Sequence, residues 1–357
     1  MISKDPAYPD GPVIQNKAYG SYYAGCASGP KVHEYLQEMN REVLSKYDIM
    51  TVGEAPHTSA EEAVPYTAAD RGELNMVFHF DHMHLDYDEN GKYAKTRVNL
   101  VDLKQVMTTW QEKMQECGGW NSLYWSNHDQ ARAVTRFGNE TPKYRVLSAK
   151  MLGTVLHMMQ GTPYIFEGEE LGMTNAFFDK IEDYRDIEAL DIFKDFTERK
   201  GFSEADTLEL LRLKSRDNAR TPMQWDTSAG AGFTTGEPWI KVNPNYRQIN
   251  AADQLKDPDS VFHYYQKLIR LRKEMDIIVY GEFEALYRDH DQIFAYIRKL
   301  GSEKLLTVCN FSAQEAEMEL PETFAEGAQC LITNMGRKVF DRKIILNPYE
   351  AFVLYKK

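Results

Sequence analysis

The sequence has 357 residues, 43% of them hydrophobic and 12% aromatic, which is enough for a sizeable core in one large domain plus a small one. A formal net charge of −12 argues against a nucleic acid or an anionic membrane as partner, because either favours a basic face, and it favours a neutral substrate. No apolar run approaches the ~18 residues of a membrane helix. The cysteines are widely spaced and form no CxxC pair, which predicts buried, reduced thiols of a cytoplasmic protein. They are Cys26, Cys117, Cys309 and Cys330.

Helical and strand-like patterns alternate along the first half of the chain. Residues 1–30 are rich in Gly, Pro, Tyr and Ser and have no period, which predicts a long loop. Beyond this loop, amphipathic helices are predicted over residues 31–47, 100–116 and 144–160. Short apolar runs predict strands over residues 47–52, 75–80, 121–129 and 162–170. Helices that alternate with strands buried on both faces are typical of a parallel α/β sheet.

Each of these predicted strands leads into polar residues. Ligands of parallel sheets bind at the carboxyl ends of the strands, so four polar strand ends in sequence are best explained by a single cleft. The polar ends are Gly53-Glu54, Asp81-His82, Asn127-His128-Asp129 and Glu167-Gly168-Glu169-Glu170.

The second half of the chain changes character twice. Charged amphipathic helices are predicted over residues 187–214, and a loop rich in Gly, Pro, Trp and Asn follows over residues 215–246, where Trp225, Phe233 and Trp239 favour an ordered loop. A helix is predicted over residues 260–274. After about residue 278 short runs alternate at period two, which predicts an antiparallel β domain. The expected domains are therefore residues 1–277 and residues 278–357.

Glu54 and Asp129 are the strongest candidate pair for catalysis. Two carboxylates at strand ends of one sheet suit the cleavage of an acetal, in which one acid protonates the leaving oxygen and other carboxylates stabilise the developing oxocarbenium ion. Apolar neighbours would raise the pKa of the acid and keep it protonated near neutral pH. The alternative is that both carboxylates cap the helices that follow them.

Two further motifs have a structural and a functional interpretation. The run "HFDHMH" would place His82 and His84 on one face of a strand, but no helical His/Glu pair accompanies them, so a polar loop without metal is preferred. The run "RDNAR" could be an ion-pair staple of the long loop. Alternatively, Arg216 or Asp217 brackets the hydroxyls of a sugar, because bidentate donors give geometric specificity.

Several stretches closely resemble the oligo-1,6-glucosidase and α-glucosidase branch of glycoside hydrolase family 13. The resemblance runs from about Lys31 to the C-terminus, and the motifs stand in family order at family-like spacing. They are "YDIMTVGEAPHTSAEEAVPYT", "GWNSLYWSNHDQAR", "VLHMMQGTPYIFEGEELGMTN", "SRDNARTPMQWDTSAGAGFTTGEPWI" and "LIRLRKE".

The resemblance implies a fold, an activity and roles for single residues. Such enzymes have a (β/α)8 barrel with a C-terminal β-sandwich and hydrolyse α-glucosidic bonds with retention through a covalent glucosyl-enzyme. Glu54 matches the general acid/base, and Asp129 matches the carboxylate that grips the sugar and stabilises the transition state. His128 and Arg216 match residues that bind the same sugar. Glu167 stands where many relatives carry Gln.

The resemblance also has a large departure. The nucleophile of the family is an aspartate two residues after an arginine at the end of barrel strand four, and the sequence contains no Arg-x-Asp. The strands found here correspond to barrel strands five to eight, so strands one to four and the calcium loop of some relatives are missing. An acid and a stabiliser without a nucleophile cannot form the intermediate, which predicts that the chain is inactive alone.

The sequence is compatible with three origins of the chain and with several enzymatic activities. The chain is a fragment of a longer enzyme, one half of a split barrel, or a truncated product whose open sheet edges pair with a second copy. The preferred substrate is an isomalto-oligosaccharide, cleaved at its α-1,6 bonds, with α-1,4 bonds as the other linkage. Trehalose-6-phosphate hydrolase, dextran glucosidase and a sucrose-isomerising enzyme are alternatives. A non-catalytic glucosidase-like association protein, as in heavy chains of amino-acid transporters, belongs to a different class. No cofactor is expected.

Overall fold

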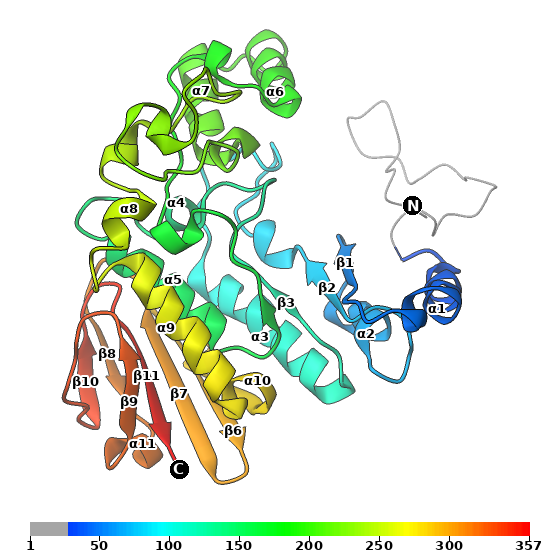
Figure 1. Cartoon of the computed structure of the whole chain (residues 1–357), viewed down its shortest axis with the longest axis vertical. Coiled ribbons are helices and arrows are strands. Elements are labelled where there is room, and N and C mark those ends of the chain that lie inside the picture. The colour runs from blue at the N-terminus through cyan, green and yellow to red at the C-terminus, as the bar shows by residue number, and fades with distance from the viewer. Residues whose placement is uncertain (1–27) are drawn as a thin grey trace. The chain divides into compact units, whose positions relative to one another are not determined.

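The computed structural model describes residues 28–357, and the predicted N-terminal loop lies outside this range except for its last three residues. Figure 1 colours these described residues from blue to red along the chain. The described residues divide into two compact units. The first holds the residues up to His82, Gln105–Leu123 and Gln160–Thr162, and the second holds Met83–Lys104, Tyr124–Met159 and Pro163–Lys357.

The first unit is built on a parallel strand pair. Strand β1 pairs with β2 in parallel, Glu54 lies opposite Phe78, and an isolated parallel bridge joins Val77 to Asn121 directly before β3. The elements are α1 (Val32–Glu42), η1 (Leu44–Lys46), β1 (Val52–Ala55), α2 (Ala60–Thr67), β2 (Met76–His79), η2 (Asp81–Met83), α3 (Leu100–Cys117) and β3 (Ser122–Leu123).

Helices cover this pair because their apolar sides face it. Leu36 of α1, Ala63 and Tyr66 of α2, and Trp110 and Met114 of α3 form one buried cluster with the strand residues Ala55 and Val77. Helix α2 begins with a capping box, in which the Ser59 hydroxyl accepts from Glu62 N–H and the Glu62 carboxylate accepts from Ser59 N–H. The α2 start is therefore set by local chemistry only a few residues after Glu54.

The predicted buried strand over residues 47–52 is wrong. Tyr47, Ile49 and Met50 are more than half exposed, and the strand ladder starts only at Val52. Within the described residues β1 has one ladder partner, β2, so the apolar run ahead of it has no neighbouring strand to cover it.

Two of the predicted strands are much shorter than expected. The strand over residues 121–129 contains only Ser122–Leu123 as β3, and the strand over residues 162–170 contains only Thr162–Pro163 as β4. Strands β3 and β4 pair with each other, and Thr162 N–H donates to Asn121 O at 2.8 Å. Beyond this pair the apolar residues Tyr124 and Trp125 are buried by packing without belonging to a ladder.

The second unit contains the remaining helices. The charged helices predicted over residues 187–214 are confirmed as α6 and α7, and the predicted loop over residues 215–246 is ordered around short 3-10 turns. The elements are α4 (Ala133–Phe137), α5 (Arg145–His157), η3 (Glu169–Leu171), η4 (Ile181–Asp183), α6 (Ile187–Glu198), α7 (Glu204–Lys214), η5 (Arg216–Asn218), η6 (Ala229–Gly232), η7 (Pro244–Arg247), α8 (Ala251–Gln254), α9 (Val261–Glu274) and α10 (Asp276–Tyr280).

The chain ends in the predicted antiparallel β domain. Its larger sheet has the order β5-β6-β7-β11-β9, and β8 and β10 form a second, two-stranded sheet. Helix α5 packs against β7, β11 and α9, as Figure 1 shows for the green and yellow helices beside the orange and red strands. The strands are β5 (Glu282–Leu286), β6 (Ile293–Leu300), β7 (Glu303–Asn310), β8 (Ala316–Glu319), β9 (Gln329–Thr333), β10 (Lys343–Leu346) and β11 (Ala351–Lys356), with α11 (Glu322–Ala325) between β8 and β9. Sequence patterns missed β9 and β10.

No helix among the described residues is long and apolar enough to cross a membrane. Cys117, Cys309 and Cys330 have free thiols, and Cys26 lies outside the described residues. Cys309 is buried as expected, but the prediction of a buried thiol is wrong for Cys117, which is exposed at the end of α3.

Candidate active site

Glu54 lies in the first unit, one residue before the end of β1, and its side chain is exposed. Because β1 and β2 are parallel, their carboxyl ends meet at one edge, and Asp81 and His82 follow β2 at that same edge. The edge therefore carries an accessible carboxylate, which suits proton exchange with a bound ligand.

His79, the last residue of β2, and His82, which follows the strand, are both buried in the first unit. His79 is stacked on the indole of Trp110 at 4.2 Å between ring centroids, and Trp110 Nε1 donates to Asp81 at 2.8 Å. Burial lowers the pKa of His79 to about 3. His82 lies in the 3-10 helix η2, so the strand alternation that would put His82 and His84 on one face is absent. Across residues 28–357 no group of three or more His, Cys, Asp or Glu side chains could hold a metal ion.

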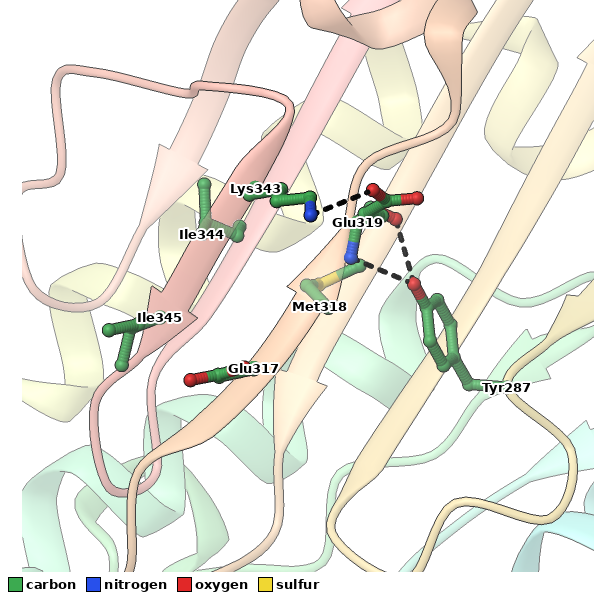
Figure 2. Close-up of a pocket in the computed structure, with 7 residues that line it drawn as sticks. All are labelled: Tyr287, Glu317, Met318, Glu319, Lys343, Ile344 and Ile345. Carbon is green, nitrogen blue, oxygen red and sulfur yellow. Dashed lines mark hydrogen bonds and ion pairs between the residues drawn. The ribbon is translucent and has the colours of Figure 1, made fainter.

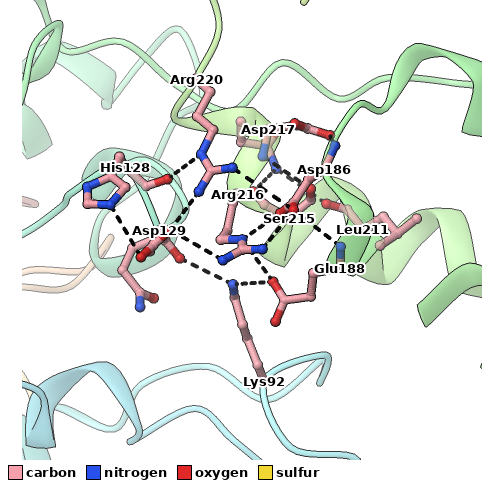
Figure 3. A network of polar contacts seen from close by, with 12 residues as sticks. Lys92, His128, Asp129, Asp186, Glu188, Leu211, Ser215, Arg216, Asp217 and Arg220 are labelled. Carbon is pink, nitrogen blue, oxygen red and sulfur yellow. Dashed lines mark hydrogen bonds and ion pairs between the residues drawn. The ribbon is translucent and has the colours of Figure 1, made fainter. Parts of the chain in front are cut away.

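Asp129 is the centre of a polar cluster in the second unit (Figure 3). Its Oδ1 accepts from Arg220 Nη2 at 2.6 Å and lies 3.5 Å from Arg216 Nη1. Its Oδ2 lies 3.4 Å from His128 Nε2. The backbone is set by Asn127, whose side chain accepts from Asp129 N–H at 2.8 Å. The structure thus brings together His128, Asp129 and Arg216, which the sequence singled out separately.

A second carboxylate orients Arg216. Asp186 accepts two hydrogen bonds from the guanidinium, at 2.5 Å from Nε and 2.7 Å from Nη2. Burial of Asp186 raises its pKa, but the hydrogen bonds from Arg216 and from Glu188 N–H outweigh this and hold the pKa below its usual value. The hydrogen bonds with Asp186 and the negative charge of Glu188 raise the pKa of Arg216. This bidentate pair leaves one guanidinium edge of Arg216 turned toward Asp129.

Lys92 closes the cluster on its other side. Its ammonium donates to Asp129 O and to the Glu188 carboxylate, both at 3.2 Å. Burial lowers the pKa of Lys92, and Glu188 counteracts part of that effect. Glu188 also lies 3.2 Å from Arg216 Nε, so positive and negative groups alternate around Asp129.

The segment that carries Arg216 and Arg220 is held in place by the buried Asp217. Asp217 is fully buried between Arg216 and Asn218, and its Oδ2 accepts from the backbone N–H groups of Arg185 and Asp186 at 2.8 and 3.0 Å. Asp217 therefore does not face a ligand. Asp217 thus holds the segment through backbone hydrogen bonds. The ion pairs of the "RDNAR" run are made by Arg216 and Arg220, which both reach Asp129.

In the acidic run after β4, Glu169 is buried, whereas Glu167 is exposed. Glu169 accepts from Ser126 Oγ at 2.9 Å and from the Tyr265 hydroxyl at 3.3 Å. Burial raises its pKa to about 7, although both hydroxyls act in the opposite direction. Ser126 stands three residues before Asp129, so Glu169 supports the loop that carries the cluster.

Sequence reasoning did not name Lys92, Asp186, Glu188 or Arg220 as site residues. Arg220 could have been predicted from the sequence, because it is the last residue of the "RDNAR" run. Asp186 caps α6 by accepting from Glu188 N–H at 3.2 Å, so the sequence signal was that of an ordinary helix start. Lys92 lies in a turn with no motif, and nothing in the sequence pointed to it.

A groove lies elsewhere in the second unit, over β8 and β10 (Figure 2). It encloses about 560 Å³ and is lined by Tyr287, three residues of β8 and three of β10. The Tyr287 hydroxyl donates to Glu319 O at 2.8 Å and accepts from Glu319 N–H at 3.0 Å, which ties the loop after β5 to the edge of β8. It shares no residue with the Asp129 cluster.

Family profiles match nearly all of the chain. Residues 1–281 match the profile described as "Alpha amylase, catalytic domain", and residues 293–353 match "Alpha-amylase SusG C-terminal domain".

Individual relatives are similar over almost the whole chain. The oligo-1,6-glucosidase of Parageobacillus thermoglucosidasius is 53% identical over 99% of this chain and 63% of its own length. The crystal structure of Bacillus licheniformis trehalose-6-phosphate hydrolase matches with a TM-score of 0.92 and 46% identity, over 99% of this chain and 63% of that chain. An isomaltulose synthase from Erwinia rhapontici NX5, solved with sucrose, matches with a TM-score of 0.89, 37% identity and the same coverage. The chain thus spans about 63% of the length of these relatives.

These matches confirm the expected resemblance and the expected fold class. A portion of a (β/α)8 barrel of the α-amylase type is followed by an antiparallel β domain.

Proposed function

The chain belongs to the α-amylase catalytic-domain family of glycoside hydrolases, and from this premise we propose that it supplies the acid/base part of a retaining α-glucosidase. The bond cleaved is the α-1,6-glucosidic bond at the non-reducing end of a short gluco-oligosaccharide, with the α-1,4 bond as the alternative linkage. The observation that carries the proposal is the cluster of Asp129 with Arg216, Arg220 and His128, in a chain 53% identical to an oligo-1,6-glucosidase.

In this proposal Asp129 binds hydroxyls of the glucose and stabilises the oxocarbenium-like transition state. Arg216 and Arg220 hold the Asp129 carboxylate in one orientation, since both donate to it. His128 and Arg216 present further donors to the same sugar. Glu54 protonates the leaving oxygen and then activates the water that releases glucose.

The retaining mechanism needs a second carboxylate as nucleophile, and the sequence has no Arg-x-Asp to supply it. We therefore propose that the chain alone does not turn over α-glucosides. No resident cofactor or metal takes part in this proposal, because the carboxylates carry both proton transfer and charge stabilisation.

The proposed partner is a segment that supplies barrel strands one to four. Within the described residues β1 pairs only with β2, and the exposed Tyr47, Ile49 and Met50 precede it, so this edge offers both backbone groups and apolar surface to a further strand. Self-association of two copies through the same edge is the alternative. Measurement of mass in solution, with and without the added segment, distinguishes the two.

Activity is tested with p-nitrophenyl α-glucoside. The chain is assayed alone and with a separately expressed segment carrying the first four barrel strands. Turnover is expected only in the mixture, abolished by Glu54→Gln and retained by Glu34→Gln, an exposed carboxylate of α1. Turnover by the chain alone that Glu54→Gln abolishes would contradict the need for a partner. Failure of the mixture would favour the non-catalytic association protein.

Trehalose 6-phosphate is the second candidate substrate, since a solved trehalose-6-phosphate hydrolase is 46% identical to the chain. The net charge of −12 disfavours a phosphorylated substrate in general. Parallel assays of the mixture with isomaltose, trehalose 6-phosphate and sucrose separate the three activities named among the relatives.

A further inference from the structure

Arg132 is a fully buried arginine three residues after Asp129, and it has no role in the chemistry described above. Its residue is 1% exposed, and burial lowers the pKa of its guanidinium. An arginine this deep is stable only when its donors are satisfied, so the identity of its acceptors shows what it holds in place.

Three of its acceptors belong to residues 216–221, the arginine segment, which carries Arg216 and Arg220. Arg132 Nε donates to Asn218 O at 3.2 Å, and Nη2 donates to Ala219 O at 3.0 Å and to Thr221 Oγ1 at 3.4 Å. Asn218 and Ala219 are two of the three residues between the two arginines. The guanidinium therefore grips the backbone at the middle of the arginine segment.

The remaining bonds of Arg132 fix its own position. Its Nη1 donates to Glu167 O, and its backbone N–H donates to Asn175 Oδ1 at 2.9 Å. Asn175 in turn donates to Arg212 O and Leu213 O at the end of α7, immediately before the arginine segment. One side chain thus connects the Asp129 loop, the loop after β4 and the arginine segment.

These contacts close a ring around the candidate site. Arg220 reaches across to Asp129 at 2.6 Å, and Arg132, on the same short stretch as Asp129, reaches back to the carbonyls beside Arg220. We propose that Arg132 is a positioning residue, which sets the place of Arg216 and Arg220 relative to Asp129 without touching the sugar. This inference rests on the proposed function for its catalytic meaning. The hydrogen bonding of Arg132 to the backbone of the arginine segment, the clamp, can be tested without any sugar.

A matched control is available in Arg298. It is also fully buried and also donates to backbone carbonyls, those of Met158, Ile278 and Gly281, but it touches no residue of the arginine segment. Arg298→Met therefore reproduces the loss of a buried guanidinium without the loss of the clamp.

The experiment compares Arg132→Met, Arg132→Lys and Arg298→Met in the full chain. The first readout is hydrogen exchange of the peptide covering residues 215–221, in which Ala219 N–H and Arg220 N–H donate to Arg216 O and Asp217 O. The second is the affinity for methyl α-glucoside, measured by calorimetry. Arg132→Met is expected to speed exchange of this peptide at least tenfold and to weaken glucoside binding about tenfold or more, as expected for misplaced binding groups.

Arg132→Lys keeps the charge and is expected to recover part of both losses. For Arg132→Ala, added ethylguanidinium is expected to refill the space and restore slow exchange of residues 215–221. Arg298→Met is expected to lower thermal stability while leaving both readouts unchanged.

The proposal is overturned if Arg132→Met leaves the exchange of residues 215–221 unchanged, or if exchange rises while glucoside affinity does not fall. Should Arg132→Met fail to fold, the same criteria apply to Arg132→Lys. If the unmodified chain binds no glucoside, the proposed sugar site fails, and the exchange readout alone decides whether the clamp exists.

Discussion

Arg220 donates to the Asp129 carboxylate at 2.6 Å and to the carbonyl of His128 at 2.8 Å, so a single guanidinium holds both the side chain of one site residue and the backbone of its neighbour. Arg220 and Asp129 are 91 positions apart in the chain. Planar, two-point contact of this kind fixes orientation, which a lysine ammonium cannot reproduce.

Arg220→Lys is therefore expected to weaken methyl α-glucoside binding by about tenfold, because Asp129 keeps a positive neighbour but loses its fixed orientation. Calorimetric titration of the full chain measures the effect. Arg199→Lys, at an exposed ion pair on α6, is the control and should bind as the unmodified chain does. Equal affinities for both variants would show that Arg220 does not orient the site.

Glu169→Gln is expected to stabilise the chain at alkaline pH. The folded pKa of Glu169 is raised to about 7 by burial, so folding favours the protonated acid. Below the unfolded pKa of about 4.3 the acid is protonated in both states, and stability falls as pH rises from there to the folded pKa, by about 1.4 kcal/mol for each unit of difference.

Glutamine keeps an acceptor for Ser126 but carries no charge at any pH. The difference in melting temperature between Glu169→Gln and the unmodified chain should therefore be small at pH 4.5 and grow up to about pH 8. Glu303→Gln, at a partly exposed carboxylate of β7, is the control for the loss of a carboxylate that is not buried. A pH-independent difference for Glu169→Gln would mean that the pKa of Glu169 is the same in the folded and the unfolded chain, which contradicts the effect of burial.

Lys104 anchors the loop between β5 and β6. Its buried ammonium donates to Tyr287 O at 2.6 Å, Ile293 O at 3.0 Å and also His290 O. Lys104→Met removes the ammonium donor from three carbonyls, of which Tyr287 O keeps the His290 N–H at 3.1 Å, and should reduce the free energy of unfolding by about 2–4 kcal/mol.

Urea denaturation measures this loss. Lys113→Met on the same helix removes only surface ion pairs and should stay within about 0.5 kcal/mol of the unmodified chain. A Lys104→Met variant as stable as Lys113→Met would refute the anchoring role.

Gly161 links the end of α5 to β4 at a φ of +131°, where a side chain would lie 2.6 Å from Asn121 O. Gly161→Ala combines backbone strain with a clash against backbone and should cost about 2–4 kcal/mol of stability. Gly118 also has a positive φ, +68°, but open space around it, so Gly118→Ala isolates the strain and should cost only about 1 kcal/mol. Similar losses in urea denaturation would show that the contact with Asn121 does not matter.

The helices could be predicted from the sequence because their signals are local. Ser260 caps α9 by accepting from His263 N–H, and the helix ends at Glu274 as the amphipathic pattern predicted. Helix α3 runs over Leu100–Cys117, within one residue of the prediction. The strands were less predictable, since an apolar run shows that a segment is buried and does not show whether a neighbour continues the ladder. Ser122–Leu123 is a strand, whereas the equally apolar Tyr124 and Trp125 are not.

By itself the sequence determined the family and the fold class, and it predicted His128, Asp129 and Arg216 as candidate site residues, because these stand in motifs whose order and spacing are visible along one chain. Only the tertiary structure decided that Lys92, Asp186, Glu188 and Arg220 surround Asp129. The same holds for the hydrogen bonds from Arg132 to the backbone of the arginine segment. The reason is physical: the charge and hydrogen bonding of a carboxylate depend on groups within a few ångströms in space, and most of those groups lie tens of residues away in the chain.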